Sequence, residues 1–176
     1  ILSGPATEEN RALLHGSPVR EELAKRILAG HAAVWVMIPG EDAETNTQLR
    51  ELLISTIREL NETLELPESM LAVYSDEQRA RVVEDLPIHF SLLELDRNDP
   101  RETVVIESLA LMAGEEWEEN DTAWVVPMFG QGRALALESS ERFTVKRMKD
   151  MAYFLTGSCS CEVKSLNPGF DLFIVE

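Results

Sequence analysis

The sequence has few of the residues that carry redox or metal chemistry. Its 176 residues include two cysteines and three histidines. The cysteines, Cys159 and Cys161, lie one residue apart near the C-terminus, whereas His15, His31 and His89 are widely separated. Zinc sites take their Cys and His ligands at short, characteristic spacings, and no histidine stands at such a spacing from the cysteines. The sequence therefore predicts no metal site and no cofactor.

Basic residues are also scarce, with 16 lysines and arginines against 32 aspartates and glutamates and a net charge of -16. The whole excess lies before residue 141, because residues 141–176 contain five acids and five bases. Nucleic acids and anionic membranes bind basic surfaces that displace their counterions, so we expect neither partner. Such an acidic surface is typical of a solvated face, and an acidic face for a basic protein partner is the alternative.

Long apolar runs are absent as well. The best candidate, residues 32–38, is far shorter than the roughly 20 residues that cross a bilayer, so we expect no membrane span. The chain begins at Ile1, and no basic segment followed by an apolar stretch indicates a signal peptide. Two explanations stay open: a leader was removed, as in a protein exported to the periplasm, or the chain is a fragment of a larger protein.

Hydrophobic spacing predicts alternating helices and strands. Residues 32–38 are uninterruptedly apolar, as expected of a strand buried on both faces. A helical stripe of leucines and isoleucines follows and ends near Leu64. The other predicted elements are a helix that starts at Pro18 after the cap Ser17 and is ended by Gly30, a short helix from Asp76, a strand over 88–95, a helix over 102–113 and an acidic loop over 115–121. Strands over 122–129 and 133–137, joined by Gly130-Gln131-Gly132, and a helix capped by Thr144 and ended by Gly157 complete the prediction.

This order of elements carries a family resemblance. Residues 34–38 and 92–96 look like two core strands, residues 49–64 like the helix that follows an active site, residues 126–135 like a strand-turn-strand, and residues 144–155 like a closing helix. Over residues 18–157 the chain resembles the thioredoxin-like superfamily. The resemblance implies an α/β fold, a three-layer α/β/α sandwich with a central mixed sheet, here with a C-terminal extension.

The resemblance also divides the chain into regions. Residues 1–16 form an N-terminal lead-in, residues 17–157 the thioredoxin-like domain, and residues 158–176 a C-terminal tail. The whole chain resembles a group of uncharacterised bacterial proteins whose tail has the form Cys-Ser-Cys, Val-Lys, Asn-Pro-Gly, Asp-Leu. That second resemblance implies no established activity.

The loop that would carry the family's catalytic cysteines contains none. It reads Pro-Gly-Glu-Asp-Ala-Glu over residues 39–44, although the start of a helix is where a thiol pKa is lowered. The resemblance therefore implies a non-catalytic module that binds or assembles protein partners. The family's cis-proline has one candidate, Pro127, which is either that proline or a bulge or unpaired position in a strand.

Cys159 and Cys161 leave three alternatives open. In an extended chain their Cα atoms are roughly 6.6 Å apart, near the limit for a disulfide, so a bridge would be strained and oxidising. That favours a catalytic pair in a thiol-disulfide oxidoreductase. Their position after the C-terminus of a helix raises thiol pKa values and favours two packing residues or a structural bridge. Metal binding by the same sulfurs is the third alternative.

Three other features are expected to be structural. Trp35 and Trp124 lie within apolar strands, which indicates core positions rather than ligand contacts. Gly130-Gln131-Gly132 lacks the third glycine and the following helix of a phosphate-binding loop, so it is predicted to be a hairpin turn. The acidic loop over 115–121 is expected to be solvated, with binding of a cation or a basic peptide as the alternative.

Overall fold

The computed structural model describes residues 7–8, 16–66, 68–72, 74–85, 88–119 and 121–157. It contains a five-stranded mixed sheet whose order is β2-β1-β3-β4, with β5 also paired to β3. β1 and β2 are parallel, whereas β3 is antiparallel to β1, β4 and β5. The strands are β1 (Ala33–Ile38), β2 (Phe90–Glu94), β3 (Trp124–Phe129), β4 (Arg133–Ala134) and β5 (Glu138–Ser139). The predicted α/β class with a mixed sheet is confirmed.

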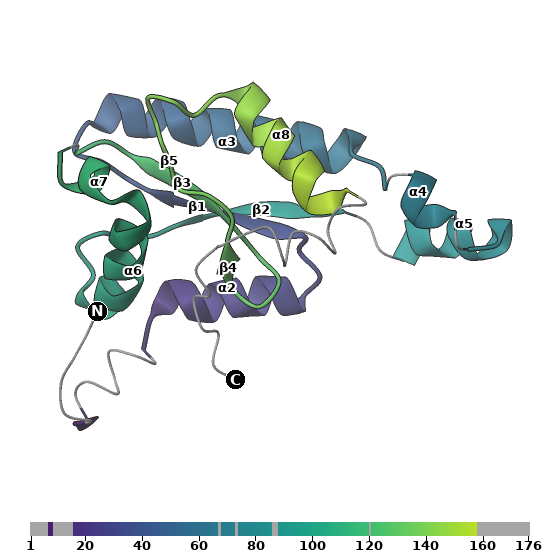
Figure 1. The fold of residues 1–176 in the computed structure, drawn as a ribbon, viewed down its shortest axis with the longest axis horizontal. Helices are drawn as coiled ribbons and strands as arrows, with labels where there is room; N and C mark the ends of the chain where they lie inside the picture. Colours follow the sequence, from purple (N-terminus) through teal and green to yellow (C-terminus); the bar gives the residue numbers. More distant parts are fainter. Residues whose placement is uncertain are drawn as a thin grey trace.

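Helices cover both faces of this sheet. α3 and α8 lie on one face, and α2 and α6 lie on the other (Figure 1). The helices are α2 (Pro18–Leu28), α3 (Ala43–Thr63), α4 (Glu68–Leu71), α5 (Asp76–Asp85), the 3-10 turn η1 (Pro100–Glu102), α6 (Thr103–Ala113), α7 (Glu115–Glu119) and α8 (Val145–Thr156). The predicted N-caps Ser17 and Thr144 are confirmed, since each side chain accepts a hydrogen bond from the first turn of its helix.

The core has two halves because side chains alternate along β1. Trp35 and Met37 pack toward α3 and α8, while Val34 and Val36 pack toward α2 and α6. All six residues of β1 are buried, which is why its sequence is apolar without interruption. Trp124 is buried as well, so the prediction of core positions for both tryptophans is confirmed.

Pro127 lies in the middle of β3 and interrupts the pairing on one side of it. The described residues contain no cis peptide bond, so the cis alternative for Pro127 is wrong. Met128 pairs with Ala134, whereas Val125 pairs with Glu138, which leaves one extra residue in the partner segment opposite Pro127. This is a bulge, and it forms where proline has no N–H to donate to the neighbouring strand. The predicted strand over 133–137 is therefore confirmed only over Arg133–Ala134, which form β4. Residues 135–137 belong to no strand, and β5 begins beyond the predicted range at Glu138.

The predicted acidic loop over 115–121 is also wrong in part, because Glu115–Glu119 form α7. Gly114 ends α6 with a positive φ of 63° and lets the chain turn into the new helix. Trp117 then stacks on Trp124 with ring centroids 5.6 Å apart, and the Arg97 guanidinium lies 4.9 Å from the Trp117 ring. These tertiary contacts stabilise a helical turn that its run of glutamates disfavours.

Candidate functional site

The loop between β1 and α3 is held by a side chain from α3. The Gly40 amide donates a hydrogen bond to Asn46 Oδ1 at 2.8 Å, and Asn46 Nδ2 donates back to the Gly40 carbonyl at 2.8 Å. The Glu41 amide donates to the Asp121 carbonyl at 3.0 Å. Both polar backbone groups of Gly40 are thus satisfied by one amide side chain, which fixes the loop on its helix.

Gly40 also lies against the backbone of the segment that leads into β3. A Cβ added at Gly40 would be 2.4 Å from the Asp121 carbonyl oxygen and 2.7 Å from the Ala123 amide nitrogen. Only glycine fits at this distance, so no nucleophilic side chain can occupy position 40 without moving one of the two segments.

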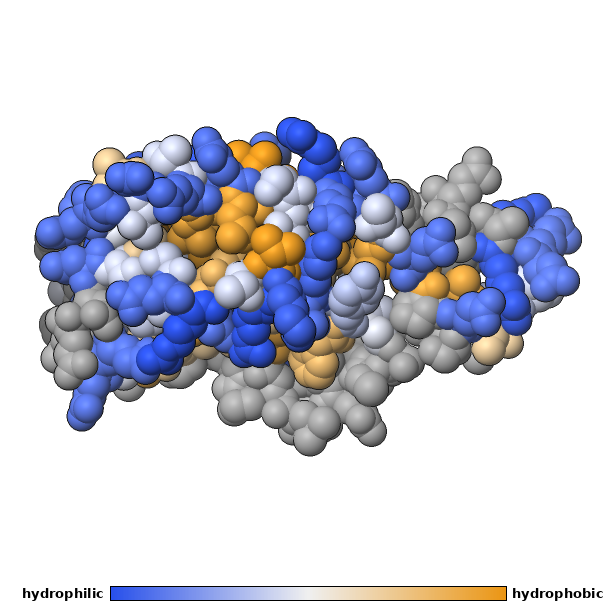
Figure 2. Space-filling view, turned by 90° about the horizontal axis from the view of Figure 1, so that it is seen from above, coloured by the Kyte–Doolittle hydropathy of each residue, from blue (hydrophilic) through white to orange (hydrophobic). Residues whose placement is uncertain are grey.

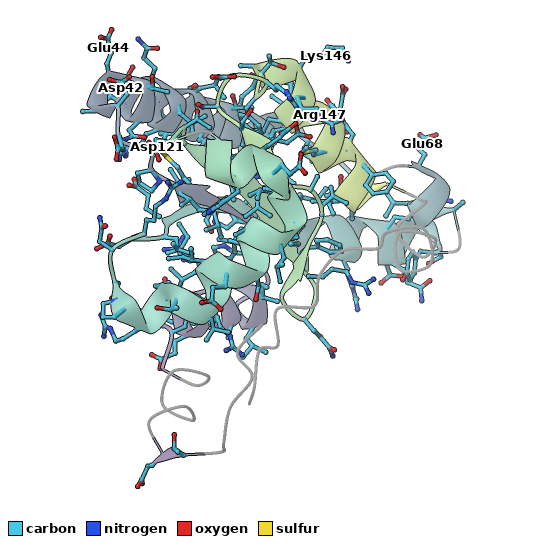
Figure 3. The ribbon with its side chains drawn as sticks, turned by 60° about the vertical axis from the view of Figure 1, so that its left-hand side comes forward. Asp42, Glu44, Glu68, Asp121, Lys146 and Arg147 are labelled. Atoms are coloured by element: carbon cyan, nitrogen blue, oxygen red, sulfur yellow. The ribbon has the colours of Figure 1, made fainter. Side chains whose placement is uncertain are left out.

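Asp42 occupies the N-terminus of α3. Its carboxylate accepts hydrogen bonds from the Thr45 amide at 2.8 Å and from the Thr45 hydroxyl at 2.5 Å. The hydroxyl and then the amide of Thr45 lower the pKa of Asp42 below its ordinary value, so this cap is ionised at neutral pH. Asp42 and Glu44 are exposed at this end of the helix (Figure 3). The partial positive charge of the helix is thus already matched by a carboxylate.

The two candidate catalytic cysteines, Cys159 and Cys161, lie outside the described residues, as does the whole predicted tail over residues 158–176. The Gly130-Gln131-Gly132 segment is a turn between β3 and β4, with φ values of 57° at Gly130 and 84° at Gly132. Only glycine adopts such angles readily, so the shape of the turn is enough to explain both glycines and no ligand needs to be invoked.

A shallow cavity of about 410 Å³, wide open to solvent, lies between α3 and the outer edge of β2; the sequence did not indicate it. Ile54, Ile57, Phe90 and Leu92 provide its apolar part. Its polar lining consists of Arg58, Asn61, Glu62, His89 and Ser91. The layer of α3 and α8 shows further apolar surface between charged side chains (Figure 2).

Two side chains cover the hydrogen-bonding groups along this edge of β2. Asn61 of α3 accepts from the Phe90 amide at 2.8 Å and donates to the Phe90 carbonyl at 3.0 Å. Arg26 of α2 donates to the Leu92 carbonyl at 2.6 Å. An edge strand with free backbone groups is a template for another strand, and these contacts occupy both groups of Phe90 and the carbonyl of Leu92.

Two histidines and a serine meet at the start of the parallel strands. His31 Nδ1 lies 2.8 Å from Ser91 Oγ, and the rings of His31 and His89 meet edge to face with centroids 4.4 Å apart. Burial, and then the neighbouring His89 and Arg26, lower the pKa of His31 below its ordinary value. The histidines look isolated in the sequence, and only the pairing of Ala33 with Phe90 brings them together.

No protein-family model matches this chain, and neither the curated proteins nor the solved structures contain a match.

The loop at the start of α3 is held by hydrogen bonds between its backbone and the Asn46 side chain, and it carries carboxylates. Residues 39–44 contain no sulfur. Among the described residues, no cluster of three or more His, Cys, Asp or Glu side chains is placed to hold a metal ion. No helix in the described part of the chain is both long and apolar enough to span a bilayer.

Proposed function

We propose that this protein is a non-catalytic thioredoxin-like module that binds or assembles protein partners. The strand order β2-β1-β3-β4 supports the fold, with β1 parallel to β2 and antiparallel to β3. A long helix follows β1 directly, and a closing helix packs on the same face of the sheet. These are the arrangements that the resemblance to the thioredoxin-like superfamily implies.

The observation that carries the non-catalytic part is the closed loop between β1 and α3. A reactive thiol there needs space, and it needs the positive end of the helix to lower its pKa. Gly40 has no space for a side chain, and the Asp42 carboxylate takes the helix end. A carboxylate in that place would raise the pKa of a nearby thiol by like-charge repulsion. The loop is thus suited to structural packing and surface recognition.

The competing function is a thiol-disulfide oxidoreductase that uses Cys159 and Cys161. An insulin-reduction assay with the full chain separates the two proposals. We expect the wild type and the Cys159→Ser and Cys161→Ser variants to give the same rate as buffer with reductant alone. Turnover by the wild type that is lost in either variant would establish the enzyme and overturn the non-catalytic proposal.

A binding role also requires a partner that is retained without the thiols. To find it, we would replace Glu44, at the exposed end of α3, with a photo-cross-linking amino acid. The labelled chain would be expressed in cells of the organism from which it comes. We expect a discrete adduct with one protein, equally abundant in the Cys159→Ser/Cys161→Ser double variant. A chain with the cross-linker at position 81 on α5 is the control for non-specific capture. Loss of the adduct in the double variant, or no adduct at position 44 above this control, would contradict the proposal.

A further inference from the structure

The open cavity beside β2 has the volume of a small-ligand site, and this inference does not depend on the proposed protein partner. Its volume of about 410 Å³ lies within the roughly 300–1,000 Å³ typical of ligand pockets. Phe90 and Ile57 form a buried floor, while Ile54 is 43% exposed at the mouth. An apolar ligand bound here would bury the exposed part of Ile54 and its own apolar surface, and removing both from water favours binding.

The cavity also contains a cation with no partner. Among the described lysines and arginines, Arg58 alone makes no hydrogen bond, ion pair or ring contact. The chain has twice as many acidic as basic residues, so a described cation left without a counter-ion is unexpected. Arg58 is exposed on α3, and its guanidinium can form a bidentate contact with a carboxylate.

The other polar groups in the lining restrict the ligand. The Asn61 side chain is hydrogen-bonded to the backbone of Phe90, and the Ser91 hydroxyl is hydrogen-bonded to His31. Glu62 lies one helical turn after Arg58 in the same lining and would repel a second negative charge on the ligand. His89, which is exposed, remains available as a donor beside the apolar floor.

The covered edge of β2 excludes an extended peptide as the occupant. A peptide that added as a strand would need the outward backbone groups of Phe90 and Leu92. Asn61 already holds both groups of Phe90, and Arg26 holds the Leu92 carbonyl. The occupant must therefore be a compact molecule that rests on side chains.

We propose that this cavity binds a small monocarboxylate with an apolar body. The body lies against Ile54, Ile57 and Phe90, and the carboxylate pairs with Arg58. Glu62 limits the ligand to a single negative charge.

The proposal is tested by titrating the ¹⁵N-labelled full chain with octanoate, octan-1-ol and octylamine, which share one apolar body and differ in the charge of the head group. We expect octanoate to bind most tightly and to shift amide resonances within residues 54–62 and 89–92. Arg58→Gln should weaken octanoate binding roughly tenfold, equivalent to about 1.4 kcal/mol, and leave octan-1-ol unaffected. Arg81→Gln on α5 is the matched control and should change neither ligand.

A second variant tests the apolar part of the site. Ile54 is exposed, so Ile54→Asp should fold normally, and its added carboxylate should abolish octanoate binding. The proposal is overturned if octan-1-ol or octylamine binds as tightly as octanoate, if Arg58→Gln leaves octanoate affinity unchanged, or if the shifted resonances lie outside this cavity.

Discussion

Replacing Gly40 with alanine measures how tightly the loop before α3 is packed. The added Cβ would lie 2.4 Å from the Asp121 carbonyl oxygen, whereas ordinary contact begins near 3.4 Å, so one backbone must move by about 1 Å. Overpacking of this kind costs about 1–3 kcal/mol. Loss of the hydrogen bond from the Glu41 amide to Asp121 adds about 0.5–1.5 kcal/mol. The reduced entropy of the unfolded alanine chain offsets about 0.4–1 kcal/mol.

We therefore expect Gly40→Ala to lower the free energy of unfolding by about 2 kcal/mol. Urea unfolding followed by tryptophan fluorescence is a suitable assay because Trp35 and Trp124 are buried. Glu41→Ala is the matched control: its side chain is exposed and its backbone contact remains, so its stability should stay within about 0.5 kcal/mol of the wild type. If Gly40→Ala is equally close to the wild type, the loop is not closed against residues 121–123 and the reasoning is refuted.

Three further predictions concern contacts between elements. Asn61→Ala should cost about 1–3 kcal/mol and expose the edge of β2, which concentration-dependent self-association in analytical ultracentrifugation would reveal; unchanged stability would contradict the covered edge. The buried Glu102 carboxylate accepts hydrogen bonds from the Ser17 hydroxyl at 2.5 Å and from the Val19 amide at 2.7 Å. In chemical unfolding, Glu102→Ala should lower the free energy of unfolding by about 3 kcal/mol, and Glu102→Gln should lower it by less. Equal losses in the two variants would argue against these hydrogen bonds. Because the pKa of His31 is lowered in the folded protein, the unfolded chain binds a proton at this histidine more readily, so the free energy of unfolding should fall as the pH drops below about 6.5 and level off below the folded pKa. His31→Gln should flatten this part of the pH profile, as measured by thermal unfolding at each pH. An unchanged slope in the variant would exclude His31 as the cause.

Much of the fold could be read from local patterns. Ser17 and Thr144 were identifiable as caps because an N-cap needs only a side-chain oxygen and the next turn of backbone. The strand character of β1 followed from its unbroken apolar run, and α3 followed from its stripe of leucines. Each signal lies within one element, so no tertiary information was needed.

The errors arose where distant residues compete with local preference. α7 is a helix because Trp117 reaches Trp124, although the local run of glutamates predicted a loop. β4 and β5 are separate because Pro127, on another strand, lacks the N–H that would join them. Trp124 and Pro127 act through ring packing and strand pairing, which the spacing of residues along the chain does not show.

The absence of sulfur from residues 39–44, and the acids in its place, are properties of the sequence alone. So are the excess of negative charge and the single close pair, Cys159 and Cys161. Only the tertiary structure decided that Gly40 has no room for a side chain, that Asn61 covers part of the edge of β2, and that Arg58, alone among the described basic residues, lies unpaired in the lining of the cavity. The physical reason is that composition and periodicity describe neighbours along the chain, whereas close approach and pairing depend on how the strands are ordered.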